Sequence, residues 1–177
     1  MDKQKLKVII SGGGTGGHLF PAFAIADELK KKLAKCQIHF VGSKFGMEAK
    51  YYLKRDESYT LLNIRGFARG QSIKNLLRNL LFPLRFVSSY LHSRRLLTKF
   101  APDVVVGTGG YASGLPLLAA IHKDIPTVIH EQNSYPGFTT RWLANRVNTV
   151  CISYESTQNF LKKKVWCLPG IPFGRNY

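Results

Sequence analysis

The chain alternates between short apolar stretches and longer segments with helical spacing. Lys7-Val8-Ile9-Ile10 is typical of a buried strand. After Gly17, apolar residues recur three and four positions apart, which predicts an amphipathic helix (Phe20, Phe23, Ala24, Ala26, Leu29 and Leu33). Further strands are predicted at 37–41, 103–106 and 127–129, with an apolar helical segment at 115–121. This alternation predicts an α/β fold in which an open, Rossmann-like, doubly wound parallel sheet carries helices on its faces.

A predicted helix in the middle of the chain carries a stripe of apolar residues, and two environments could cover it. Its apolar residues are Ile73, Leu76, Leu77, Leu80, Leu81 and Leu84, and Pro83 is expected to end or kink the helix. The stripe is either part of the core or an apolar face on a membrane, to which Phe82 and Phe86 would add ring area. Between Glu57 and Asp103 there is no acid, while eight basic residues occur there: Arg65, Arg69, Lys74, Arg78, Arg85, Arg94, Arg95 and Lys99. Close to an anionic surface, each would contribute about 1 kcal/mol of binding free energy.

Composition narrows the classes of function. The net charge is +16, but aromatic residues are not interleaved with basic ones in an RNP-like pattern, so nucleic acid is not expected as a partner. Cys36, Cys151 and Cys167 have no metal-ligand spacing, and neither a disulfide framework nor a metal site is expected. No stretch approaches the roughly 20 apolar residues of a spanning helix, and the N-terminal apolar run is too short for a secretory signal. A cytoplasmic globular domain is therefore expected.

A glycine-rich loop, Gly12–His18, follows the first predicted strand. The N–H groups of such a loop and of the helix after it favour an anion, so a phosphorylated ligand is expected. Gly12, Gly14 and Gly17 satisfy the dinucleotide fingerprint, but the second strand ends at Gly42-Ser43 without the acid that holds a ribose. The loop is not a nucleoside triphosphate loop either, because His18 stands where that motif has lysine.

Two further loops are expected at the same edge of the sheet. Gly107-Thr108-Gly109-Gly110-Tyr111 follows the strand at 103–106 and repeats the Thr-Gly-Gly and ring pattern of Thr15–His18. His130-Glu131-Gln132-Asn133 follows the strand at 127–129. Because the carboxyl ends of parallel strands share one edge, the three loops predict a single pocket.

Taken together, these motifs resemble the MurG family of glycosyltransferases. They are Gly-Gly-Thr-Gly-Gly-His with Pro21-Ala22, Ile64-Arg65-Gly66, Gly107-Thr108-Gly109-Gly110-Tyr111-Ala112-Ser113-Gly114, and His130-Glu131-Gln132-Asn133 with Pro136-Gly137. The resemblance covers essentially all 177 residues. It implies the N-terminal half of a two-domain GT-B enzyme. Residues 1–168 would form the acceptor-side domain, and residues 169–177 would begin the crossover to a C-terminal donor-binding domain.

The resemblance also implies an activity. The family transfers N-acetylglucosamine from UDP-N-acetylglucosamine to the muramoyl 4-hydroxyl of undecaprenyl-diphospho-muramoyl-pentapeptide, with inversion, which converts lipid I to lipid II in peptidoglycan synthesis. It acts as a peripheral protein on the cytoplasmic side of the bacterial cell membrane, docks there through the N-terminal domain, and needs no metal or other cofactor. This chain alone is expected to be inactive, because the second domain carries most donor contacts. The alternatives are a stand-alone module that binds a diphosphate lipid, and a nicotinamide-dependent Rossmann domain.

Several residues carry the expected chemistry. His18 opens the first helix, and histidine is the side chain used most often in general acid–base catalysis, so it is either the general base for the acceptor hydroxyl or a group that orients the loop. Glu131 is either a second base or a partner that fixes a neighbouring histidine. Asn133, which the family places at the donor sugar, is alternatively a helix N-cap. Other substrate-binding candidates are Thr15, Gly16, Gly17, Gly109, Gly110, Tyr111 and Ser113, of which Tyr111 and Ser113 are alternatively local caps. His39, His92 and His122 are expected to be structural.

A few positions depart from the family pattern. Thr140 precedes Arg141 where the family usually has Asn before the basic residue, and Leu115 stands where Pro is common. Gly170-Ile171-Pro172 replaces the family's Gly-Asn-Pro at the crossover, so Arg175 receives no role.

Overall fold

The computed structural model describes residues 5–66, 68, 70, 72–162 and 166–167. In chain order the elements are β1 (Leu6–Ser11), α1 (Gly16–Lys32), β2 (Cys36–Ser43), α2 (Glu48–Tyr51), the 3-10 helix η1 (Tyr52–Lys54), β3 (Ser58–Leu62), α3 (Ile73–Leu80), α4 (Phe82–Phe100), β4 (Val104–Gly107), α5 (Tyr111–Ile121), β5 (Thr127–Glu131), α6 (Phe138–Leu143), β6 (Thr149–Ile152), the 3-10 helix η2 (Glu155–Phe160) and β7 (Trp166–Cys167). The predicted crossover, 169–177, lies outside the described residues.

One parallel sheet in the order β3-β2-β1-β4-β5-β6-β7 organises the domain. The chain adds β2 and β3 on one side of β1, then returns to place β4 and the later strands on the other side. The predicted α/β, doubly wound parallel sheet is therefore confirmed. The strand order reverses between β1 and β4, and this switch point is where open α/β sheets bind ligands. Both Thr-Gly-Gly loops leave the sheet there.

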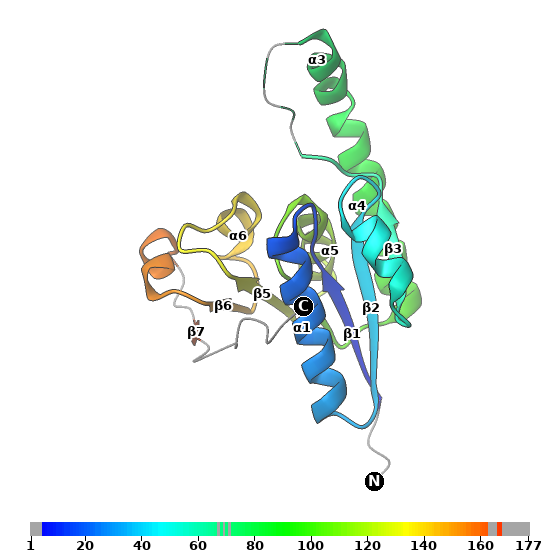
Figure 1. Ribbon diagram of the computed structural model, residues 1–177, viewed down its shortest axis with the longest axis vertical. Coiled ribbons are helices and arrows are strands. Elements are labelled where there is room, and N and C mark those ends of the chain that lie inside the picture. The colour runs from blue at the N-terminus through cyan, green and yellow to red at the C-terminus, as the bar shows by residue number, and fades with distance from the viewer. Residues whose placement is uncertain (1–4, 67, 69, 71, 163–165, 168–177) are drawn as a thin grey trace.

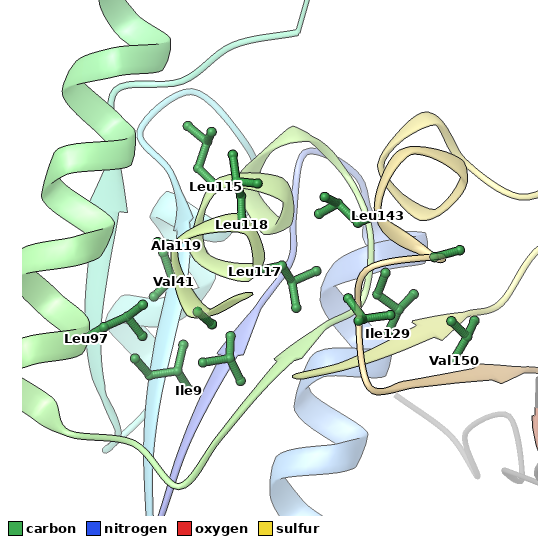
Figure 2. Packing of buried hydrophobic residues seen from close by; sticks show 14 of the residues in the cluster. Ile9, Val41, Leu97, Leu115, Leu117, Leu118, Ala119, Ile129, Leu143 and Val150 are labelled. Atoms are coloured by element: carbon green, nitrogen blue, oxygen red, sulfur yellow. The ribbon is translucent and has the colours of Figure 1, made fainter. Parts of the chain in front are cut away.

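Helices cover both faces of the sheet, as Figure 1 shows for α1 on one side and α4 and α5 on the other. Successive residues of a strand point to opposite faces. Accordingly Val8 and Ile10 pack with the α1 residues Leu19 and Phe23, whereas Ile9 belongs to the other core cluster. Figure 2 shows that second cluster, in which Ile9 and Val41 from the sheet lie near Leu97 of α4 and Leu117 of α5. A parallel sheet buried on both faces holds its strand ends, and hence the loops, in place.

The expectation that Pro83 ends or kinks the helix predicted at 73–84 is confirmed. The segment forms two helices, α3 and α4, because Pro83 occupies the first turn of a new helix, where its missing N–H costs nothing. Of the two alternatives left open for the stripe, the core one is wrong, because Leu76, Leu80 and Leu84 are 70%, 73% and 70% exposed. Phe82 and Phe86 are partly buried against the core instead.

The exposed apolar side chains of this region are Ile73, Leu76, Leu80, Leu81, Leu84, Val87 and Leu91, here called the α3–α4 face. Figure 1 shows α3 and the start of α4 extending past the sheet at the end where the glycine loops lie. Arg69 and the side chains of Lys74, Leu77 and Arg78 lie outside the described residues. Within the described part of the chain, no helix is both long and apolar enough to span a bilayer.

Candidate active site

The two Thr-Gly-Gly loops interlock at the switch point. Thr108 donates its backbone N–H to the Ser11 carbonyl at 2.9 Å and its hydroxyl to the His18 carbonyl at 2.7 Å. Gly110 has a φ of +77°, and a Cβ there would lie 2.2 Å from the Gly13 carbonyl oxygen. Only glycine accepts both conditions. The loop after β4 is thus held against the loop after β1.

His18 lies where three loops meet. Its Nδ1 is 3.0 Å from the Thr108 carbonyl oxygen and 2.6 Å from the side-chain amide of Gln132. A Cβ on Gly109 would lie 2.4 Å from the same nitrogen, so the glycine provides the space for the ring. The ring therefore joins the loops after β1, β4 and β5, and it remains half-exposed.

The contact with the Thr108 carbonyl favours one tautomer of His18. A carbonyl oxygen can only accept, so Nδ1 must carry the proton that it donates to Thr108. The 2.6 Å contact between Gln132 and Nδ1 fits this tautomer only with the amide oxygen, and not Nε2, towards the ring. Nε2 keeps its lone pair in this tautomer. A neutral imidazole held in this way is able to accept a proton at Nε2.

The first glycine loop is held by a buried carboxylate that the sequence analysis missed. Glu48, at the start of α2, accepts from the Gly14 N–H at 2.8 Å and from the Ser43 N–H at 2.7 Å. A Cβ on Gly13 would lie 2.2 Å from the Glu48 carboxyl carbon. The expectation that these glycines make room for a phosphate is therefore wrong at Gly13 and Gly14, where the anion is Glu48 itself.

The start of α1 retains donors for a ligand. Thr15, Gly16 and Gly17 are exposed or half-exposed where α1 begins. The N–H groups of Gly16 and Gly17 come before the first intrahelical bond, which runs from the His18 N–H to the Thr15 carbonyl at 3.2 Å. Thr15 is the N-cap residue but makes no side-chain capping hydrogen bond. Tyr52 was also missed: its buried hydroxyl donates to the Gly12 carbonyl at 3.2 Å, and burial raises its pKa, which keeps it a donor.

Glu131 is placed to shape the third loop. Its Oε1 accepts from the backbone N–H and the side-chain amide of Asn133, at 3.1 and 2.8 Å. Its Oε2 accepts from the Gly137 N–H at 2.9 Å and the Thr140 hydroxyl at 2.5 Å. Only 2% of Glu131 is exposed. Four donors already occupy its two oxygens, so the geometry argues against a base at Glu131, and its partners are loop residues rather than a histidine.

Asn133 is exposed in this loop. Glu131 holds its amide, and its backbone carbonyl accepts from the Thr157 hydroxyl at 2.9 Å. The alternative role as a helix cap is wrong, because the N-cap of α6 is Gly137. The side chain is thus fixed yet accessible.

Two further candidates follow the second glycine loop, and they differ in exposure: Tyr111 lies at the surface and Ser113 is buried. Tyr111 begins α5 and is 43% exposed. Ser113 is fully buried and donates to the Gly110 carbonyl at 2.9 Å, which matches the capping alternative and not contact with a substrate. Thr139 donates to the same carbonyl at 3.0 Å, so Gly110 is held from two elements.

The other histidines have structural surroundings. His39 is bonded to the hydroxyls of Ser58 and Thr60, and burial lowers its pKa to about 4. His122 is 2.6 Å from the Tyr90 hydroxyl, and His92 is exposed on α4. His130 is buried, which lowers its pKa and keeps it neutral.

The chain is similar to known glycosyltransferases in sequence and in structure. It is 44% identical to UDP-N-acetylglucosamine--N-acetylmuramyl-(pentapeptide) pyrophosphoryl-undecaprenol N-acetylglucosamine transferase of Flavobacterium psychrophilum, with 96% of this chain aligned, and 40% identical to the protein of that name from Lactiplantibacillus plantarum, with 94% aligned. It covers 45% of each, so the chain spans about half the length of these curated relatives.

Among solved structures, the crystal structure of Acinetobacter baumannii MurG matches with a TM-score of 0.76 and 28% identity. The match covers 97% of this chain and 47% of that one. A UDP-N-acetylglucosamine 2-epimerase matches with a TM-score of 0.58 at 15% identity, which shows a shared fold alone. Residues 8–152 match the family model of the glycosyltransferase family 28 N-terminal domain. The resemblance to the MurG family is confirmed, and the chain belongs to glycosyltransferase family 28.

Proposed function

We propose that this chain is the acceptor-side domain of an inverting N-acetylglucosaminyltransferase. In the whole protein, residues 1–168 would form this domain and residues 169–177 would lead to a donor-binding domain. The donor would be UDP-N-acetylglucosamine, and the acceptor the muramoyl 4-hydroxyl of undecaprenyl-diphospho-muramoyl-pentapeptide. The relatives that align over 94–96% of this chain carry the name of this reaction.

The observation that carries the proposal is the arrangement at His18. Its Nδ1 is directed at the Thr108 carbonyl, 3.0 Å away, and its Nε2 is left with a lone pair at the switch point of the sheet. In the proposed step, Nε2 takes the proton of the acceptor hydroxyl as that oxygen attacks the anomeric carbon of N-acetylglucosamine. The bond to UDP breaks on the opposite face, which inverts the configuration and leaves UDP with the electron pair.

Neighbouring groups supply binding rather than proton transfer. The N–H groups of Gly16 and Gly17 would bind a phosphate or sugar oxygen at the helix N-terminus. Asn133, fixed by Glu131, would bind the donor sugar. Tyr111, Gly109 and Gly110 would line the acceptor side.

The acceptor is a membrane lipid, and the α3–α4 face suits a peripheral position at the cytoplasmic surface of the bacterial membrane. The seven apolar side chains of that face are exposed, and α3 and the start of α4 extend past the end of the sheet that carries the loops. Arg85, Arg94 and Arg95 on α4 would add attraction to anionic lipid headgroups. No nucleic acid partner is proposed.

The test uses the whole protein, with both domains, and measures transfer of labelled N-acetylglucosamine to a lipid-linked acceptor analogue. His18→Ala is expected to lower kcat by about 10²–10⁴-fold, the range for loss of a general base, without a change in the unfolding midpoint. His122→Ala is the matched control, since His122 lies away from the loops and is expected to leave kcat unchanged. Near-normal turnover by His18→Ala would overturn the assignment.

A further inference from the structure

An apolar groove of about 400 Å³ opens beside the candidate active site. It lies among α4, α5 and α6 and is lined mainly by Phe82, Phe86, Tyr111, Leu115, Phe138 and Trp142. The Trp142 ring stands against Phe86 and Phe138, with centroid distances of 6.4 and 6.3 Å. The volume falls within the range of small-molecule sites, and the lining is almost wholly carbon.

Contacts join the inner end of the groove to the second glycine loop. Tyr111, which lines the groove, directly follows Gly110. Thr139, another lining residue, donates to the Gly110 carbonyl at 3.0 Å. A ligand that enters the groove would therefore continue toward Gly109, Gly110 and His18.

Two arginines gather next to the groove around one aromatic ring. The guanidinium carbon of Arg65 lies 3.6 Å from the centre of the Phe45 ring, and that of Arg85 lies 5.8 Å from it. Each is next in sequence to a residue that lines the groove, Ile64 or Phe86. In the described part of the chain, neither makes an ion pair with a carboxylate.

The loop that carries Ile64, Arg65 and Gly66 contacts the candidate active site at Tyr111. A Cβ on Gly66 would lie 2.3 Å from the Tyr111 ring, so the backbone beside Arg65 packs directly on the first residue of α5. The Ser43 hydroxyl donates to the Ile64 carbonyl at 2.6 Å and fixes the loop from the other side. Stacking on Phe45 restrains the guanidinium groups while their N–H edges stay available, the arrangement that arginine uses to bind phosphate.

We propose that the groove and the Arg65–Arg85 pair form one subsite for a prenyl diphosphate. The groove would hold the isoprenoid units nearest the diphosphate, and the two guanidinium groups would bind the diphosphate itself. The two arginines lie next to the apolar groove, just as the diphosphate of such a ligand is joined to its apolar chain. The groove leads to the glycine loops, where sugar transfer would occur. The inference rests on the proposed function and specifies how the acceptor lipid is held.

The test uses this 177-residue chain with Trp166→Phe, which leaves Trp142 in the groove as its single tryptophan. Farnesyl diphosphate, kept below its micelle-forming concentration, should change Trp142 fluorescence saturably. It should bind at least about tenfold more tightly than pyrophosphate or farnesol alone. Arg65→Gln and Arg85→Gln should each weaken farnesyl diphosphate about tenfold and leave farnesol unaffected. Arg94→Gln, on the same helix but away from Phe45, is the matched control and should change neither affinity.

Three results would overturn the subsite: no response of Trp142, equal affinity for pyrophosphate and farnesyl diphosphate, or equal weakening by Arg94→Gln and Arg85→Gln. The last would mean attraction by net charge alone. His18→Ala should bind farnesyl diphosphate normally, which separates this inference from the proposed function. If the whole protein transfers sugar but Arg65→Gln and Arg85→Gln change nothing, the subsite fails and the proposed function stands. Binding with the expected variant pattern, but no transfer, would support the subsite and refute the proposed function.

Discussion

Replacing Glu131 by Gln tests whether this residue positions the third loop or acts as a base. The carboxylate accepts four hydrogen bonds, two at each oxygen. In the amide, an NH₂ group replaces one oxygen and faces the backbone N–H of Asn133 or Gly137, which cannot accept, so at least one bond is lost and those that remain no longer involve a charge. A hydrogen bond to a charged group contributes about 1.5–3 kcal/mol, and we expect a loss of roughly 3–4 kcal/mol in the free energy of unfolding.

The assay is urea unfolding of this chain, together with thermal unfolding. For a domain of this size each kcal/mol lowers Tm by about 2–4 °C, so the change should be roughly 10 °C. The control is Glu28→Gln, which removes only an exposed ion pair with Lys31 at 3.0 Å and should cost less than about 1 kcal/mol. If Glu131→Gln unfolds at the wild-type midpoint, the four-bond account of Glu131 is refuted. Loss of turnover with unchanged stability would instead favour the base.

Two further predictions concern substitutions in the glycine loops and in the α3–α4 face. Gly110→Ala should destabilise the chain by about 2–3 kcal/mol in urea unfolding, because its φ is +77° and the new Cβ meets the Gly13 carbonyl. Gly17→Ala, in a helix with no close contact, should cost nothing or stabilise slightly, and equal losses in the two variants would contradict the strain argument. Combined Leu76→Ser, Leu80→Ser and Leu84→Ser should reduce flotation with phosphatidylglycerol vesicles while Tm stays near the wild-type value, since all three side chains are exposed. A large fall in Tm would show that they are core after all.

Local pattern was enough to predict most of the central sheet. Lys7–Ile10, 37–41, 103–106 and 127–129 all lie within or overlap observed strands, because strands buried on both faces are continuous apolar runs. The short strands β3 and β6 were not predicted. They carry polar and half-exposed residues, so their sequences do not differ clearly from loops.

In the α3–α4 segment, the spacing of apolar residues predicts a helix but not the burial of its apolar face. Apolar residues at three- and four-residue spacing identify a helix and its apolar face, but not what covers that face. The tertiary structure leaves Leu76, Leu80 and Leu84 exposed, while Phe82 and Phe86 pack against the core. That difference depends on where α4 crosses the sheet.

The sequence by itself determined the α/β class, the three loops at one sheet edge and the family, since strand periodicity and glycine motifs are local signals. Only the tertiary structure decided which side chains hold those loops. Glu48 binds Gly14 from 34 residues away, and Gln132 meets His18 from 114 residues away. Glu48 does not stand out in the sequence, because a buried glutamate looks like any surface one until the fold supplies its donors. Gln132 lies in a predicted loop, but its contact with His18 was not predicted. The physical reason is that hydrogen bonds between loops depend on distances in space, which strand order and helix packing set.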